Sequence, residues 1–223
     1  MKSVKDYIIS IPDFPSKGII FRDVTSVLES SEGYALAIDE LNKLLDGVDY
    51  DLIAGTESRG FIFGAPLAYM NKKGFIPVRK KGKLPRETVE MSYDLEYGSA
   101  TIEIHKDAIK PGDKVVLVDD LIATGGTIQA AAKLVEELGG EVVKMIFLIE
   151  LTDLGGRKLL EGYDVASVVQ IQTGEALFLT DCNISEVDYY VYYQPVINSD
   201  GSVIGAIEVA TPMQNVKDTI SMQ

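Results

Sequence analysis

Two adjacent acids, Asp119 and Asp120, follow a run of four apolar residues and precede a short loop of threonines and glycines. Glycines let a backbone approach a ligand closely and adopt positive φ. If a helix begins directly after this loop, the N–H groups of the loop and of the helix N-terminus form an anion site, which the helix dipole reinforces. The threonine hydroxyls add donors, and the two carboxylates can accept hydrogen bonds from sugar hydroxyls. The pattern predicts a site for a phosphorylated sugar, formed by Asp119, Asp120, Ala123, Thr124, Gly125, Gly126 and Thr127.

Two other interpretations of this stretch compete with a sugar-phosphate site. It could be a plain helix cap followed by a tight glycine turn, but adjacent acids at the end of a buried strand are costly without partners. It could also be a nucleotide-binding P-loop of the Walker type. That pattern requires Gly-Lys followed by Ser or Thr, and the sequence contains no such triplet.

The charge distribution bears on the kind of partner. The net charge is −13, the wrong sign for a nucleic-acid surface built on Lys and Arg, so we expect no nucleic-acid partner. Against this background a basic cluster stands within eight residues: Arg79, Lys80, Lys81, Lys83 and Arg86. Such a run is either a solvated loop or a local anion site, since a small group of donors can hold a phosphate inside an acidic protein.

The elements that must position these residues alternate between strand and helix. Short apolar runs predict strands at residues 51–55, 74–78, 114–120, 142–151 and 163–171. Helical spacing predicts helices at residues 34–45, 60–72 and 128–138. Continuous apolar strands are typical of parallel sheets covered on both faces, so we expect an α/β fold with a central, mostly parallel sheet flanked by helices. Residues 80–98 show no period of their own and are expected to form a long functional loop, such as a lid.

The stretch around Asp119 and Asp120 resembles the signature with which type I phosphoribosyltransferases bind phosphoribosyl pyrophosphate (PRPP). Three further segments narrow the resemblance to the adenine phosphoribosyltransferase family: residues 18–25 (GIIFRDVT), 55–61 (GTESRGF), and 82–87 (GKLPRE) leading to 93–98 (YDLEYG). The resemblance runs from about residue 3 to about 171. It implies the type I fold, with a small N-terminal hood and a mobile lid, and the conversion of adenine and PRPP to AMP and pyrophosphate.

The resemblance also implies roles for individual residues. It assigns Glu96 and Tyr97 to catalysis, with Glu96 managing a proton on adenine. It assigns the loop at residues 123–127 to the 5′-phosphate and the two acids to the ribose hydroxyls. It places a cis peptide bond at Glu57-Ser58. The implied pyrophosphate-binding residues are Glu57, Ser58, Arg59, Arg79, Lys80 and Lys83, and the implied adenine-binding residues are Ile20, Phe21 and Arg22.

The resemblance implies Mg²⁺ as the cofactor. Because the sequence has no His/Cys cluster with metal-ligand spacing, we expect no protein metal site and Mg²⁺ that arrives chelated by PRPP. The resemblance implies a homodimer. Two alternatives stay open: a related enzyme that uses hypoxanthine, xanthine or orotate, and a PRPP-sensing regulator.

The remaining residues, 172–223, do not fit the family pattern. They resemble the last strands of a Cache-type extracellular sensor domain, and we expect two strands around Asp200-Gly201 and a short helix over residues 213–220. We therefore divide the chain into a phosphoribosyltransferase domain, 1–171, and a C-terminal extension, 172–223. The extension is either a catalytically neutral fragment or an oligomerisation or regulatory element. The single cysteine, Cys182, and the lack of a long apolar run favour a cytoplasmic protein without a membrane partner.

Overall fold

The structure is a computed structural model that describes residues 2–14, 20–94, 99–172, 177–184, 187–197 and 203–212, with side chains for 2–14, 20–93 and 100–172. Its elements fall into two compact units. The larger comprises residues 1–8 and 24–171, and the smaller comprises residues 9–23 and 172–223.

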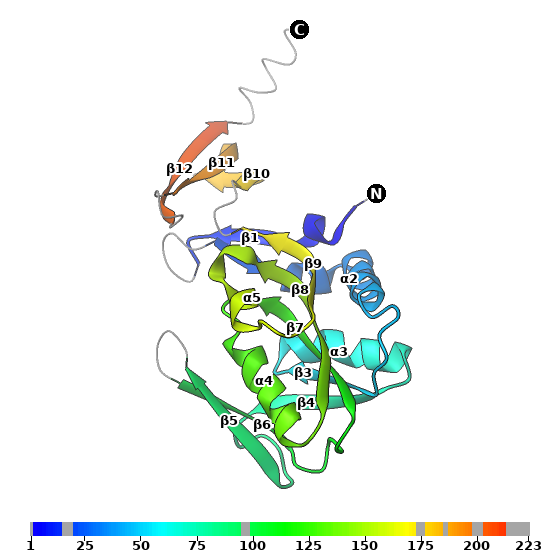
Figure 1. Cartoon of the computed structure of the whole chain (residues 1–223). Coiled ribbons are helices and arrows are strands. Elements are labelled where there is room, and N and C mark those ends of the chain that lie inside the picture. The colour runs from blue at the N-terminus through cyan, green and yellow to red at the C-terminus, as the bar shows by residue number, and fades with distance from the viewer. Residues whose placement is uncertain are drawn as a thin grey trace. The chain divides into compact units, whose positions relative to one another are not determined.

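The sheet of the larger unit has seven strands in the order β5-β6-β4-β3-β7-β8-β9 (Figure 1). In chain order these are β3 (Leu52–Thr56), β4 (Gly74–Lys80), β5 (Thr88–Asp94), β6 (Ser99–His105), β7 (Lys114–Ile122), β8 (Glu141–Leu151) and β9 (Val165–Ile171). Five neighbouring strands of this sheet run parallel to one another, in the order β4, β3, β7, β8 and β9. β6 is antiparallel to β4, and β5 is antiparallel to β6. The predicted α/β fold with a mostly parallel sheet is confirmed.

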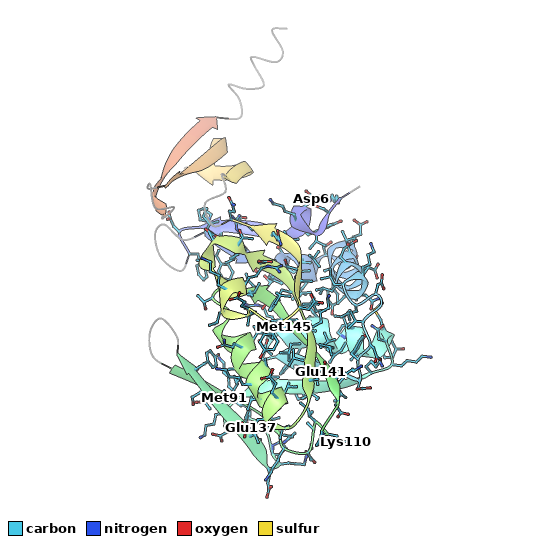
Figure 2. The ribbon with its side chains drawn as sticks, viewed as in Figure 1. Asp6, Met91, Lys110, Glu137, Glu141 and Met145 are labelled. Carbon is cyan, nitrogen blue, oxygen red and sulfur yellow. The ribbon has the colours of Figure 1, made fainter. Side chains whose placement is uncertain are left out.

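The helices of this unit cover the sheet on both faces. They are η1 (Val4–Tyr7), α1 (Thr25–Glu29), α2 (Ser31–Lys43), α3 (Arg59–Met70), α4 (Gly126–Glu137), η2 (Thr152–Leu154) and α5 (Gly156–Leu159). Alternate residues of β7 enter different core clusters: Val116 and Val118 pack with α2 and α3, whereas Val115 and Leu117 pack with α4. Met145 of β8 is fully buried in the second cluster (Figure 2). The continuous apolar run before Asp119 therefore exists because both faces of β7 are covered.

The expectation that residues 80–98 form one long loop is wrong in part. β5 occupies residues 88–94 and pairs with β6 in a continuous antiparallel register from Thr88↔His105 to Asp94↔Ser99. Val89, Met91 and Tyr93 alternate along β5 and pack against the core cluster that contains α4, and Figure 2 labels Met91. The described part of the segment is thus a hairpin arm whose apolar face is held by packing. Residues 95–98, the tip of the predicted lid, lie outside the described residues.

The smaller unit contains two antiparallel sheets. β1 (Ile9–Pro12) pairs with β2 (Ile20–Asp23), in the segment predicted as the hood. β10 (Leu177–Ile184), β11 (Val187–Ile197) and β12 (Val203–Pro212) form a three-stranded sheet. The predicted pairing of the last two strands is confirmed, whereas β10 was not predicted. The expected Asp-Gly turn and the expected helix over 213–220 lie outside the described residues.

Among the described residues, no helix is both long and apolar enough to cross a bilayer.

Candidate active site

The loop that follows β7 leads directly into α4, as the sequence predicts. Gly125 adopts φ +86°, a left-handed conformation that favours glycine, and α4 begins at the next residue. The loop and the end of β7 line a pocket of about 110 Å³. Six of the seven residues predicted for the sugar phosphate line it: Asp119, Ala123, Thr124, Gly125, Gly126 and Thr127. The pocket lies at the carboxyl end of a central parallel strand, where open α/β sheets bind ligands.

The carboxyl group of Asp119, which lines this pocket, has polar groups close to it. Its Oδ1 accepts a hydrogen bond from the Asp120 N–H at 2.9 Å. Burial of the group and the negative charge of Asp120 next to it raise the pKa of Asp119 to about 8, although the Thr56 hydroxyl has a smaller, lowering effect.

Gly60, in the first turn of α3, leaves the space in which the Asp119 side chain sits. A Cβ atom at this position would lie 2.8 Å from the Val118 carbonyl oxygen, 2.8 Å from Thr56 Oγ1 and 3.1 Å from Asp119 Oδ1. Two of these distances are shorter than a van der Waals contact between a carbon atom and an oxygen atom, so only glycine fits here. The close approach of α3 to β7 thus depends on Gly60.

Asp120, the second acid, is 4% exposed and forms an ion pair with Arg59 Nε, from the start of α3. Arg59 was predicted as a pyrophosphate ligand and Asp120 as a ribose ligand, 61 residues away. The pair joins the loop after β3 to the end of β7, so the structure brings these two predicted substrate-binding segments together. A buried carboxylate without such a partner would be strongly disfavoured.

The predicted pyrophosphate loop follows β3. The Glu57-Ser58 peptide bond is cis, as the resemblance implies. Glu57 Oε2 accepts hydrogen bonds from Arg79 Nε and from the Lys80 N–H, both at 3.1 Å. Three residues predicted to bind pyrophosphate are therefore in direct contact with one another at the carboxyl ends of the adjacent strands β3 and β4.

Glu103 of β6, which was not among the predicted site residues, holds the main chain of the basic cluster. Its carboxylate is 3% exposed and accepts hydrogen bonds from the main-chain N–H groups of Lys83 at 2.9 Å and Leu84 at 2.8 Å. Burial on its own would raise the pKa of Glu103, yet these main-chain hydrogen bonds hold it below its usual value. Glu103 thus fixes the backbone of the loop that carries Lys83.

A further contact links the hairpin arm to the loop at residues 123–127. Thr127 Oγ1, predicted to bind the 5′-phosphate, donates a hydrogen bond to the Tyr93 hydroxyl of β5 at 3.0 Å. Tyr93 was not among the predicted site residues, although its place in the alternating pattern of β5 could have indicated it. The phenol is therefore next to the loop that the sequence assigns to phosphate.

Two groups of predicted residues are not joined to this site by the structure. Glu96 and Tyr97 lie outside the described residues. Ile20, Phe21 and Arg22 belong to β2 in the smaller unit. There the Phe21 ring packs edge-on against Phe14 with centroids 5.1 Å apart, and Arg22 Nη1 donates to Ser10 Oγ at 2.5 Å.

Among the described residues, no group of three or more His, Cys, Asp or Glu side chains could hold a metal ion. Asp119 lines the pocket, whereas Asp120, the next residue, is paired with Arg59.

The model of the phosphoribosyl transferase domain matches residues 27–186, which is more than half of the chain. The chain belongs to the phosphoribosyl transferase family. Within this family it is 72% identical over 169 residues to the adenine phosphoribosyltransferase of Agathobacter rectalis, covering 76% of this chain and 97% of that relative. It is 70% identical to the Butyrivibrio fibrisolvens protein of the same name, over 77% of this chain and 95% of the relative.

Solved structures of phosphoribosyltransferases support the same assignment. The adenine phosphoribosyltransferase of Thermoanaerobacter pseudethanolicus superposes with a TM-score of 0.73 at 57% identity, over 75% of this chain and 98% of that chain. The Saccharomyces cerevisiae enzyme, solved in complex with adenine and an imino-altritol bisphosphate, superposes with a TM-score of 0.70 at 41% identity, over 74% and 96% of the two chains. The type I phosphoribosyltransferase fold is confirmed.

The end of the chain is similar to a different family. The model named single cache domain 3 matches residues 156–223, which supports the resemblance to Cache domains. The two matches overlap, since the phosphoribosyl transferase match extends to residue 186 and the Cache match begins at residue 156. The overlap includes β9, whose strand pairing with β8 belongs to the catalytic sheet.

Proposed function

We propose that this chain transfers the 5-phosphoribosyl group of PRPP to adenine, giving AMP and pyrophosphate. The observation that carries the proposal is the loop at residues 123–127, which lines a pocket next to Asp119 and Asp120 at the carboxyl end of β7. The choice of adenine rests on the names of relatives that share 72% and 70% of their residues with this chain.

In this reaction the bond between C1′ of the ribose and the pyrophosphate oxygen breaks, and a bond from C1′ to N9 of adenine forms. The pyrophosphate leaves with the electron pair, and adenine loses a proton. Glu96 is the group that we assign to accept this proton, with Tyr97 beside it in the sequence. The loop N–H groups, Thr124 and Thr127 hold the 5′-phosphate, while Asp119 and Asp120 accept hydrogen bonds from the ribose hydroxyls.

Negative charge develops on the departing pyrophosphate. The residues that we assign to stabilise it are Glu57 and Ser58, through their backbone, together with the cations Arg59, Arg79, Lys80 and Lys83. The contacts of Glu57 with Arg79 and Lys80 support this assignment because they gather the cationic segment at one edge of the sheet. Ile20, Phe21 and Arg22 are assigned to the adenine base.

We propose Mg²⁺ as the cofactor, carried by PRPP and still partly hydrated. When bound, Mg²⁺ would neutralise charge on the leaving group. The chain is further proposed to act in the cytoplasm as a homodimer.

The assay that tests the function measures AMP formation from adenine, PRPP and Mg²⁺, with hypoxanthine, guanine and orotate in parallel. We expect turnover with adenine alone. Turnover with another base would contradict the proposed specificity. A folded protein that binds PRPP and turns over no base would instead be a PRPP-sensing module.

We also propose that residues 1–171 form the catalytic domain and that 172–223 are an extension without a catalytic role. The curated relatives support this division, since the chain covers 95–97% of their length with only 76–77% of its own. A truncation that ends at Gln172 is the suitable variant, because the carbonyl oxygen of this residue accepts a hydrogen bond from Arg22 Nη2 at 3.4 Å.

For this truncated chain, residues 1–172, we expect the kcat, the KM for both substrates and the thermal midpoint of the full chain. Steady-state kinetics and thermal unfolding of the two proteins provide the comparison, and light scattering reports their oligomeric state. A changed KM for adenine, or a different oligomeric state, would show that the extension is a regulatory or oligomerisation element.

A further inference from the structure

The short turn at residues 155–160, which follows β8, packs directly against the loop at residues 123–127. A Cβ atom at Gly156, the first residue of α5, would lie 2.4 Å from the Ala123 carbonyl oxygen and 2.8 Å from Cγ1 of Ile122. From the other side, a Cβ atom at Gly125 would lie 3.0 Å from the Gly156 carbonyl oxygen. The backbone at Gly156 and the backbone of the loop are therefore in direct contact, with no room for a side chain between them.

The position of Gly156 is fixed by its neighbour Arg157. The Arg157 guanidinium donates from Nε to Glu150 Oε1 at 2.5 Å and from Nη2 to Glu150 Oε2 at 2.7 Å, and its Nη1 donates to the Val165 carbonyl oxygen at 2.8 Å. This two-point pairing with a carboxylate defines direction as well as distance. It ties the turn to both β8 and β9.

The carboxylate that receives Arg157 is itself held in one place. Glu150 is 4% exposed and accepts a further hydrogen bond from Ser167 Oγ at 2.6 Å. Burial on its own would raise the pKa of Glu150, but the hydrogen bonds from Arg157 and Ser167 hold it below its usual value. The acid is therefore charged at neutral pH and anchors Arg157 from inside the sheet.

A second tie joins the other end of the turn to α4. Gln129 Nε2, one turn into the helix, donates to the Leu159 carbonyl oxygen at 2.9 Å, and Leu160 is buried in the core cluster that contains α4. The turn is thus connected to the sheet at Arg157 and to α4 at Leu159, while Gly156 between them touches the loop.

We propose that Gly156, held in place by the Glu150–Arg157 pair, is a positioning residue that sets the backbone of the loop at residues 123–125 for the 5′-phosphate. The proposal rests on the proposed function for the identity of the ligand. Its physical basis is that N–H groups stabilise an anion only when they point to it, so a backbone displaced by a fraction of an ångström loses that alignment.

The variant that tests the proposal is Gly156→Ala, which adds one methyl group against the Ala123 carbonyl. We expect it to weaken binding of ribose 5-phosphate, measured by calorimetry, by about tenfold to a hundredfold. Binding of inorganic pyrophosphate, which the other loop receives, should not change. In kinetics the variant should raise the KM for PRPP with a smaller effect on kcat.

The matched control is Gly155→Asn, one residue earlier. Gly155 has φ +72° with no atom within 4 Å of an added Cβ, and asparagine tolerates this left-handed conformation better than other side chains. The control perturbs the same turn without touching the loop, so both ligands should bind as to the wild type. Equal weakening of ribose 5-phosphate binding in the control and in Gly156→Ala would overturn the proposal.

If Gly156→Ala does not fold, Arg157→Lys serves as the second variant, because lysine keeps the charge but loses the two-point contact with Glu150. We expect a smaller loss of ribose 5-phosphate affinity and, again, unchanged pyrophosphate binding. Wild-type affinity for ribose 5-phosphate in a folded Gly156→Ala protein, or in Arg157→Lys where Gly156→Ala does not fold, would also overturn the proposal. If the wild type forms no AMP from any base while these binding differences persist, the proposed function fails and the positioning role stands.

Discussion

Asp119→Asn is expected to stabilise the unliganded protein and to lower its activity at the same time. The pKa of Asp119 is raised to about 8 in the folded chain, against an ordinary value of 3.8. Between these two pH values the folded state holds a proton that the unfolded state has lost. The free energy of unfolding of the wild type therefore falls with rising pH through this window, by about 1.4 kcal/mol per pH unit.

Asparagine has no proton to lose, so the advantage of the variant should be absent near pH 4 and should grow towards pH 8. Thermal unfolding at several pH values measures it, and we expect the variant to melt several degrees higher at pH 7 or above. The activity should fall by about a hundredfold in kcat/KM for PRPP, since the hydrogen bonds that we assign to the ribose hydroxyls would then have to be made with an amide in place of the carboxyl group.

The matched control for this experiment is Asp39→Asn, an exposed acid of α2 that the structure places in no part of the site. This control should change neither the melting temperature nor the activity. An Asp119→Asn protein with the wild-type pH dependence of stability would mean that Asp119 is ionised in the folded state at neutral pH, contrary to its raised pKa.

Glu103→Ala is expected to have the second large effect, on both stability and PRPP binding. The substitution leaves the main-chain N–H groups of Lys83 and Leu84 without their acceptor and releases the loop that carries the basic cluster. We expect a loss of about 2–3 kcal/mol in the free energy of unfolding. The KM for PRPP should rise, because the cations assigned to pyrophosphate are no longer held at the edge of the sheet.

Glu90 provides a close control, because it lies directly opposite Glu103 in the register of β5 and β6. Its carboxylate is partly exposed and pairs with Lys81 at 2.6 Å. Surface ion pairs contribute at most about 1 kcal/mol, so Glu90→Ala should cost little stability and leave the KM unchanged. Equal effects of the two substitutions would contradict the anchoring role of Glu103.

The pH dependence gives this prediction a second check. Since the pKa of Glu103 is lower in the folded chain than its usual value of 4.5, its contribution to stability is present above that value and is lost as the pH falls through the folded pKa. The difference in stability between the wild type and Glu103→Ala should therefore shrink in acid. Denaturant unfolding at pH 7 and at pH 3 measures it.

The central strands could be predicted from the sequence because their chemistry is local. The apolar run before Asp119 and the helical spacing after Thr127 each lie within one element, and both have the predicted character. β5 was missed although Val89, Met91 and Tyr93 alternate within this seven-residue strand, because the charged, glycine- and proline-containing residues before it obscured the period. β10 was missed because Thr180, Asp181 and Asn183 interrupt its apolar residues.

The contacts that define the site could not be predicted, because each of them joins residues far apart in the chain. Arg59 and Asp120 are separated by 61 residues and meet only because β3 and β7 are neighbours in the sheet. Glu103 accepts a hydrogen bond from the backbone N–H of Lys83, which is 20 residues away in the chain. A glutamate within an apolar strand does not by itself indicate which backbone group it will contact. The contact of Gly156 with Ala123 depends on backbone packing alone, to which a sequence pattern gives no access.

The direction of the parallel strands has a practical consequence for anyone who wishes to attach a label or a surface to this protein. β9 runs parallel to β8 and ends at Ile171, so the chain leaves the sheet at the edge that carries the substrate loops. An affinity tag attached after this strand would therefore begin at the same end of the sheet as the proposed substrate loops. Lys110 and Glu141 lie at the opposite edge, before β7 and at the start of β8 (Figure 2). Immobilisation through Lys110 would leave the catalytic edge facing the solution.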